Sequence, residues 1–328
     1  MDPISQAPDH AAAVRALTHA RVLVIGDVML DRYVHGGVHR MSIEAPVPIL
    51  SIVEEIEQPG GAGNVVRNLT ALGAAVALIS VVGDDAAGSD LTGLVGGQPG
   101  VEPWLLVQGR RTTTLKTRFV ADGRQLLRAD REDTDPIHPK LAERLVRIAS
   151  DAMAATSVTV LSDYGKGVLA GEVPAALVAN ARRVGRTVIV DPRGTDFARY
   201  AGADIVMPNR PELAAAIGLP TETEAQIVAA AQALRARFGF GVVVVTRGND
   251  GMTLCDADRV LHFPAEAPVI LDTSGAGDTA LATLAAAVAV KLPLPVAVRL
   301  ANLAAGLSVG APGNSVVREA DLLAALVV

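Results

Sequence analysis

The sequence is poor in aromatic residues and contains a single cysteine. Only 3% of its 328 residues are aromatic, 20% are charged, and the net charge is −6. The one cysteine, Cys255, excludes an intrachain disulfide and a cysteine-rich zinc site, and it fits a reducing compartment. The negative charge, with no basic block, argues against nucleic-acid and membrane-surface binding. An anionic ligand would therefore need a local cluster of basic side chains.

The sequence also lacks the pattern of a secretory signal or a membrane span. The segment before Ala11 is polar and acidic, whereas a signal peptide joins a basic start to an apolar core. The apolar stretch Thr279–Leu294 is rich in alanine and is interrupted by Lys291 and Pro293. We expect it to form a buried helix. These features predict a cytoplasmic protein.

What the sequence does contain is an alternation of apolar runs with helical patterns in a chain that is 50% hydrophobic. The runs typical of strands buried on both faces are Arg21–Ile25, Val76–Val82, Val158–Leu161, Thr187–Val190, Asp204–Met207 and Gly241–Val245. The helical patterns are Ala62–Leu72, Leu141–Ala154, Val173–Val184, Pro211–Ile217 and Glu222–Arg237. This order predicts an α/β fold with a mostly parallel sheet, whose ligands bind beyond the carboxyl ends of the strands. Polar motifs fall at those ends, at Gly26-Asp27, Ser162-Asp163, Asp191-Pro192, Pro208-Asn209 and Thr246–Gly248.

Two stretches break this alternation. Val47–Glu57 has the periodicity of a strand, and Thr112–Val120 and Gln125–Asp130 flank an Asp-Gly hairpin signal. Together with Tyr33–Gly37 they predict a small β-sheet, either a lid over a cleft or an extension of the main sheet. With no internal repeat or linker, we expect a single domain, 1–328, with lid segments at about 33–57 and 110–131.

The most informative segment is Asp272–Thr279, which joins an apolar, strand-like run to the alanine-rich helix. Gly275 and Gly277 allow a tight turn, and a helix that starts there presents free N–H groups to an anion. Asp278 would repel a phosphate unless it accepts a proton from a hydroxyl group while the N–H groups hold the phosphoryl group. An ordinary turn with an aspartate cap is the alternative interpretation.

A second glycine-rich helix start lies at Gly60–Asn64. It lacks the lysine of a P-loop, and its N–H groups and the Asn64 amide suit sugar hydroxyls. A tight strand-to-helix connection would have the same residues. Asp27 and Asp31 follow the first strand and could accept two hydroxyl protons, although Asp31 also fits a helix cap.

Lys116 and Arg118 alternate on one face of a predicted lid strand, with Arg110, Arg111 and Arg124 nearby. This cluster is the basic site that a phosphorylated ligand would need in an acidic protein. A solvated sheet edge carries the same kind of residues.

Two further strand ends carry candidate nucleotide-binding groups. Glu212 could order water around Mg²⁺ and Asn209 could reach a phosphate, or the pair could form a capping box. Thr246–Gly248 could meet a triphosphate or form a plain turn.

These motifs, in this order, resemble the ribokinase/PfkB carbohydrate kinase family from Gly26 to Ser315. The two family signatures correspond to Gly60-Gly61-Ala62-x-Asn64 and Asp272-x-x-Gly275-Ala276-Gly277-Asp278, and Asn209-x-x-Glu212 is similar to the magnesium-associated motif. The resemblance implies a ribokinase-like three-layer α/β/α fold with a mostly parallel central sheet and a small β-sheet lid. It also implies in-line phosphoryl transfer from Mg·ATP.

A narrower resemblance is to the heptose-phosphate kinase branch of this family, and it rests on Val24–Tyr33, Glu44–Pro48, Ser162–Gly167 and Asp191–Phe197. That branch phosphorylates O1 of D-glycero-β-D-manno-heptose 7-phosphate on the route to ADP-heptose for lipopolysaccharide. Ile43, Gly63 and Arg193 depart from the pattern of the branch, so a kinase of fructose phosphate or ribose, or a non-catalytic binder, stays open. The chain ends at Val328 without the nucleotidyltransferase domain of bifunctional relatives, so we expect the stand-alone kinase, as a homodimer.

The resemblance assigns a role to each motif. Asp278 would be the general base, and the N–H groups of Gly275, Ala276 and Gly277 would stabilise the transferring phosphoryl group. The residues expected to bind the sugar phosphate are Asp27, Asp31, Gly60, Gly61, Asn64, Lys116, Arg118, Lys166 and Arg193. Those expected near ATP are Asn209, Glu212, Thr246, Gly248, Gly251, Gly277 and Asn302. Glu212 would hold Mg²⁺ through water, and Asp272, Thr273 and Ser315 would hold a monovalent cation such as K⁺.

Overall fold

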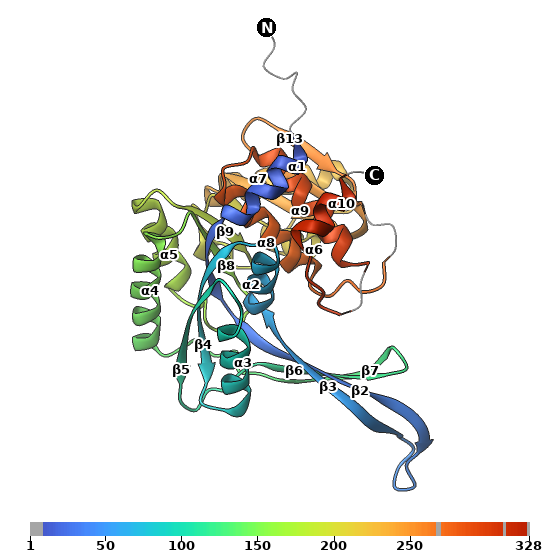
Figure 1. The fold of residues 1–328 in the computed structure, drawn as a ribbon. Coiled ribbons are helices and arrows are strands. Elements are labelled where there is room, and N and C mark those ends of the chain that lie inside the picture. The colour runs from blue at the N-terminus through green and yellow to red at the C-terminus, as the bar shows by residue number, and fades with distance from the viewer. Residues whose placement is uncertain (1–8, 267–269, 311–312, 327–328) are drawn as a thin grey trace.

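Figure 1 shows the chain as a computed structural model, which describes residues 9–266, 270–310 and 313–326. In this part the main sheet has nine strands in the order β13-β12-β11-β10-β9-β8-β1-β4-β5. All neighbours from β11 to β5 pair in parallel, and β12 and β13 are antiparallel. The strands are β1 (Arg21–Gly26), β4 (Ala75–Gly83), β5 (Val101–Gln108), β8 (Val158–Ser162), β9 (Thr187–Asp191), β10 (Ile205–Val206), β11 (Val242–Thr246), β12 (Met252–Cys255) and β13 (Val260–Phe263). The predicted, mostly parallel sheet is confirmed.

Alternate residues of the strands enter two separate cores, which makes the fold three-layered. Val22 and Val24 of β1 pack with one set of helices, whereas Leu23 and Ile25 pack with the other set. The first set is α1 (His10–Ala16), α2 (Ala62–Ala71), α3 (Ala86–Gly96), α8 (Ala276–Ala289), α9 (Leu294–Ser308) and α10 (Glu319–Ala325). The second set is α4 (Pro139–Met153), α5 (Val173–Arg183), α6 (Arg210–Ile217) and α7 (Glu224–Phe238). This arrangement explains the continuous apolar runs, because both faces of each central strand are buried.

The lid is a separate four-stranded sheet in the order β3-β2-β6-β7, and it projects from the body (Figure 1). It consists of β2 (Val28–Met41), β3 (Pro48–Gly61), β6 (Leu115–Ala121) and β7 (Arg124–Arg131). Asp122 and Gly123 turn between β6 and β7 with φ of 48° and 75°, as an Asp-Gly hairpin requires. Because these four strands form a sheet of their own, they are not an extension of the main sheet. β2 begins earlier than predicted, so Asp31 lies within a lid strand.

Several elements differ from the sequence-based expectation. The alanine-rich helix stops at Ala289, because Lys291 has a φ of 62° and Pro293 then precedes α9. The edge strand β5 was missed, since only one of its eight residues is buried and its apolar run, Trp104–Val107, is short. The strand-like run before Asp272 falls partly on residues 267–269, outside the described part, and Ile270 and Leu271 are not in a strand. Among the described helices, none has the length and apolar character to cross a bilayer.

Candidate active site

The site centres on Asp278, where the starts of helices α8 and α2 meet the carboxyl ends of the sheet strands. Asp278 is in the first turn of α8 and is 6% exposed. The Asn64 amide of α2 donates a hydrogen bond of 2.8 Å to its Oδ2, and the Tyr164 hydroxyl donates to its Oδ1. The two glycine-rich signatures, far apart in the sequence, therefore form one site.

The environment of Asp278 suits a general base. Burial raises the pKa of this carboxyl to about 6, although the hydrogen bonds from Tyr164 and Asn64 oppose the rise. The nearby carboxylate of Asp31 raises the pKa further and the Arg67 guanidinium lowers it. The side chain is thus ionised at neutral pH, yet basic enough to take a proton from a hydroxyl group.

The two glycines of the C-terminal signature are needed for different reasons. Gly275 caps α8 with a φ of 77°, and a Cβ there would lie 2.8 Å from Asn64 Nδ2. A Cβ on Gly277 would meet no described atom within 4 Å. Gly275 is therefore required by the packing of the protein, whereas Gly277 leaves room for a ligand.

Two adjoining hollows lie beside this helix start. The larger, of about 630 Å³, is lined by Asn209, Thr246, Gly248, Gly251 and Asn302, with Thr273, Ala276 and Gly277. The smaller, of about 190 Å³, is lined by Tyr164, Asp191, Arg193, Asn209, Glu212, Gly275, Gly277 and Asp278, among others. Gly277 lines both hollows, so an extended anionic ligand in the larger one would end at the base. The residues expected near ATP are thus brought together.

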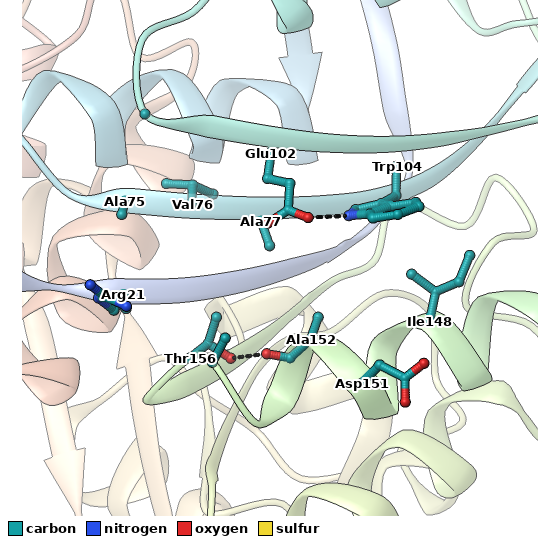
Figure 2. Close-up of a pocket in the computed structure, with 12 residues that line it drawn as sticks. Arg21, Ala75, Val76, Ala77, Glu102, Trp104, Ile148, Asp151, Ala152 and Thr156 are labelled. Atoms are coloured by element: carbon teal, nitrogen blue, oxygen red, sulfur yellow. Dashed lines mark hydrogen bonds between the residues drawn. The ribbon is translucent and has the colours of Figure 1, made fainter.

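A third hollow, shown in Figure 2, lies at the opposite end of the sheet. It has a volume of about 440 Å³ and is lined by Arg21 and Ala75 at the starts of β1 and β4, by Trp104 of β5 and by residues of α4. The Trp104 indole N–H donates to Glu102 (3.1 Å) within it. None of the predicted site residues lines this hollow. Because parallel sheets bind ligands at the carboxyl ends of their strands, we place the active site at the other end.

Asp31 and Arg118 of the lid pair with each other. Asp31 is 2% exposed, and its Oδ1 accepts a 2.5 Å hydrogen bond from the Arg118 guanidinium. Its Oδ2 accepts one of 2.9 Å from the Asn314 amide. A Cβ on Gly60 would lie 2.2 Å from the same Oδ2, so Gly60 gives this carboxylate its room. Gly61 ends β3 with a φ of 57° and is followed by α2.

Two predicted phosphate-binding lysines converge from different elements. Lys166, in the loop after β8, has its Nζ 2.8 Å from the Glu132 carboxylate. Lys116 of β6 lies 3.8 Å from the same carboxylate and 2.9 Å from Asp130. Arg193 does not join them, because it pairs with Glu212 at 3.3 Å beside the smaller hollow.

The prediction that Arg111 belongs to the basic cluster is wrong. Its side chain is buried and donates to the backbone carbonyls of Asp135 (3.0 Å) and Lys166. Arg110 and Arg124 are exposed.

Asp27 also differs from its predicted role as a sugar ligand. It is 1% exposed, and its carboxylate accepts backbone N–H groups of Tyr164 (2.9 Å), Lys166 (3.0 Å) and Val168 (3.0 Å). These N–H groups converge because Gly165 and Gly167, with φ of 67° and 88°, curl the loop around the carboxylate. We therefore reassign Asp27 from sugar binding to holding the loop that carries Tyr164 and Lys166.

Both interpretations of the Asn209–Glu212 motif are compatible with the structure. The two side chains form a reciprocal capping box at the start of α6, with bonds of 2.9 and 3.0 Å. Glu212 also lines the smaller hollow together with Asp191. Burial and the carboxylates of Asp278 and Glu212 raise the pKa of Asp191 well above its usual value. Two carboxylates at one hollow fit a hard divalent cation such as Mg²⁺. Asp191 belongs to one of the strand-end motifs, but the motif gave it no role of its own, because its nearness to Glu212 appears only in the folded chain.

Asp272 lies at the start of the segment that leads into α8. Its carboxylate accepts the N–H groups of Ser274 (2.8 Å) and Gly313 (3.1 Å). Burial opposes ionisation, but these hydrogen bonds outweigh it and lower the pKa of Asp272 below its usual range. Ser315 donates to the Ser308 carbonyl at 3.3 Å. The site for a monovalent cation at Asp272, Thr273 and Ser315 stays a prediction.

The chain matches the pfkB family carbohydrate kinases over residues 19–320. It is 62% identical to the bifunctional protein HldE of Acidiphilium cryptum over 90% of this chain, and 51% identical to that of Rhodospirillum rubrum over 99%. The chain spans 60% and 65% of the length of these two relatives.

Solved structures with the same fold include Arabidopsis thaliana ribokinase complexed with ribose and ATP, with a TM-score of 0.73 and 22% identity over 94% of this chain and 99% of that one. Another is phosphofructokinase-2 from Escherichia coli in complex with potassium, with a TM-score of 0.76 and 21% identity over 94% and 98%. The ribokinase-like fold predicted from the motifs is thus confirmed. Since the family match covers most of the chain and includes both glycine-rich signatures around Asp278, the chain belongs to the pfkB family of carbohydrate kinases.

Proposed function

We propose that this kinase transfers the γ-phosphoryl group of ATP to O1 of D-glycero-β-D-manno-heptose 7-phosphate, a step toward ADP-heptose for lipopolysaccharide. The observation that carries the proposal is the position of Asp278, which is buried and lines the smaller hollow, next to the larger one. The convergence of Lys116 and Lys166 supports a phosphorylated sugar over a neutral one. The similarity to HldE proteins supports the choice of a heptose.

The geometry supports a direct transfer. ATP would lie in the larger hollow with its γ-phosphate at the N–H groups of Gly275, Ala276 and Gly277, which the helix start leaves without partners within the helix. Asp278 would take the O1 proton as O1 attacks phosphorus and the bond to the bridging oxygen of ADP breaks. Asn64 holds the base in place. Asp191 and Glu212 would hold Mg²⁺, which when bound neutralises charge on the phosphates.

The lid would hold the sugar and its phosphate. Asp31 lies between Arg118 and Asn314 and is proposed to bind sugar hydroxyls. Lys116 and Lys166 would exchange Glu132 for the 7-phosphate, because a dianion attracts two ammonium groups more strongly than one shared carboxylate does.

Replacing Lys166 or Lys116 with Ala is expected to raise KM for the sugar phosphate about tenfold or more. The reason is that each change removes one hydrogen bond to a charged group. KM for the unphosphorylated heptose should change by less than about twofold, because that sugar makes no such contact. Steady-state assays with both sugars measure the difference, and Lys140→Ala at the exposed start of α4 is the matched control. Equal losses with both sugars would contradict a phosphate site at the lysines.

We also propose that the protein is a homodimer that buries the apolar side chains of the lid. Ile52, Val53 and Ile56 of β3 and Leu126 and Leu127 of β7 are exposed, Val53 to 80%. They lie on the two edge strands of the lid, where exposed apolar side chains and unpaired backbone groups can meet a second copy of the chain. Sedimentation velocity should give a dimer for the wild type and a monomer for Val53→Lys with Leu127→Lys. A wild-type monomer would contradict this part of the proposal.

The function itself is tested by a coupled ADP-release assay over a panel of sugars and sugar phosphates. The heptose 7-phosphate should have the highest kcat/KM. Turnover with fructose phosphate or ribose instead would assign another substrate within the same family. Sugar binding without ADP release for any member of the panel would indicate a binding protein.

A further inference from the structure

Tyr164 contacts the proposed base directly, although the motifs assign it no role. Its hydroxyl donates to Oδ1 of Asp278, while Asn64 donates to Oδ2. Each carboxylate oxygen therefore holds one donor and keeps a further lone pair for a substrate hydroxyl. The base is fixed from two sides, by α2 and by the loop after β8.

The loop that carries Tyr164 is itself held in place. The backbone N–H of Tyr164 donates to the buried Asp27 carboxylate at 2.9 Å, and the N–H groups of Lys166 and Val168 donate to the same group. Asp27 directly follows β1, an interior strand of the main sheet that pairs with β8 and β4. The phenol is thus carried by a loop that is anchored at a buried strand of the main sheet.

Tyr164 stays a hydrogen-bond donor throughout the working pH range. Burial, followed by the carboxylates of Asp278 and Asp191, raises the pKa of its phenol well above the usual value. Two other charged groups act on the pKa of Asp278 in opposite directions, Asp31 from β2 and Arg67 from α2. Asp191 at the end of β9, Arg193 after it and Glu212 of α6 line the same hollow. Removal of the phenol hydroxyl would leave the carboxylate with one donor fewer in a buried site, which favours its protonated form.

We propose that Tyr164 is a positioning residue of the kinase, whose phenol O–H orients the Asp278 carboxylate and keeps it ionised. This inference rests on the proposed function of Asp278 as the base. During transfer the sugar O1–H proton moves to Asp278, the O1–phosphorus bond forms, and the bond from phosphorus to ADP breaks. The phenol proton remains on Tyr164 at every stage.

The test is the pH profile of kcat/KM for the wild type and Tyr164→Phe. The wild type should lose activity below a pH of about 6, as Asp278 takes up a proton. In the variant this loss on the acid side of the profile (the acid limb) should move to higher pH by about one unit, because one hydrogen bond to a charged group is missing. The loss relative to wild type should be about tenfold on the acid side and less than about threefold near pH 9.

The chain offers a matched control in a second buried tyrosine–aspartate pair. The Tyr200 hydroxyl donates to Oδ2 of Asp163 at 2.6 Å, and Tyr200 is fully buried. Tyr200→Phe removes the same hydroxyl from the same kind of pair without a contact to Asp278. It should lower the melting temperature and leave the acid limb in place.

A second variant guards against loss of folding in Tyr164→Phe. Site-specific 3,5-difluorotyrosine at position 164 keeps the ring and the hydroxyl but makes the phenol a stronger donor. It should move the acid limb downward, opposite to the phenylalanine variant. Unshifted limbs in both variants, or the same shift in Tyr200→Phe, would overturn the role of Tyr164. Failure of the proposed function is distinguishable, because it would appear as retained turnover in Asp278→Asn.

Discussion

Asp278→Asn is expected to reduce kcat by about 10³-fold while ATP and the sugar phosphate still bind. The amide keeps the shape of the side chain but cannot accept the O1 proton, and a positioned general base contributes about 10²–10⁴-fold. In the described part of the site no other carboxylate is free to take over as base, because Asp31 is held by Arg118 and Asn314, and Asp191 and Glu212 of the same hollow are the groups proposed to hold Mg²⁺. Single-turnover assays measure the loss, and calorimetry measures the binding of each ligand.

The matched control is Asp90→Asn, an identical change at an exposed position of α3. It should leave kcat within about twofold of wild type, as surface substitutions away from a site usually do. Near-wild-type turnover in Asp278→Asn would sink the assignment of the base. Loss of ATP binding together with turnover would instead show that the helix start has been disrupted.

Gly277→Ala is expected to lower kcat/KM by about 10²-fold without lowering thermal stability. A methyl group there would meet no described protein atom within 4 Å, and Gly277 lines both hollows, so the methyl group would take space from a ligand. It would hold the γ-phosphate away from the N–H groups, and a displacement of about 1 Å costs on the order of 10²-fold in rate. The measurements are kcat/KM and the melting temperature.

Gly275→Ala is the contrasting variant, because its Cβ would lie 2.8 Å from Asn64 Nδ2 and the residue has a φ of 77°. It should lose both stability and activity. If Gly277→Ala kept wild-type kcat/KM, the phosphoryl group could not lie where we propose. If it lost as much stability as Gly275→Ala, Gly277 would be required by the packing of the protein and not by a ligand.

The sequence predicted the layers of this fold well, because its central strands are buried on both faces and read as continuous apolar runs. Val22 to Ile25 contribute alternately to the two cores, which no surface strand could do. The edge strand β5 escaped prediction for the opposite reason, since much of it is exposed. Local chemistry also limited the helix of α8, where Lys291 turns the chain before Pro293.

The site was predictable where a motif specifies a backbone shape. It was less predictable where the hydrogen-bond partners of a carboxylate depend on the folded chain. The glycines at 60, 61, 275 and 277 mark two helix starts, and the structure joins them through Asn64 and Asp278. Asp27 is a carboxylate of the same type as Asp31, but only the folded loop shows that it binds backbone N–H groups. Tyr164 was overlooked because a phenol has no spacing rule, and its contact with Asp278 depends on the packing of that same loop.

Phosphorus NMR of the reaction product tests the central claim most directly. With Mg·ATP and D-glycero-β-D-manno-heptose 7-phosphate, we predict ADP and a new phosphate resonance coupled to the anomeric proton, with the 7-phosphate resonance retained. Release of ADP with free phosphate, or a new phosphate on any other carbon of the sugar, would contradict the account.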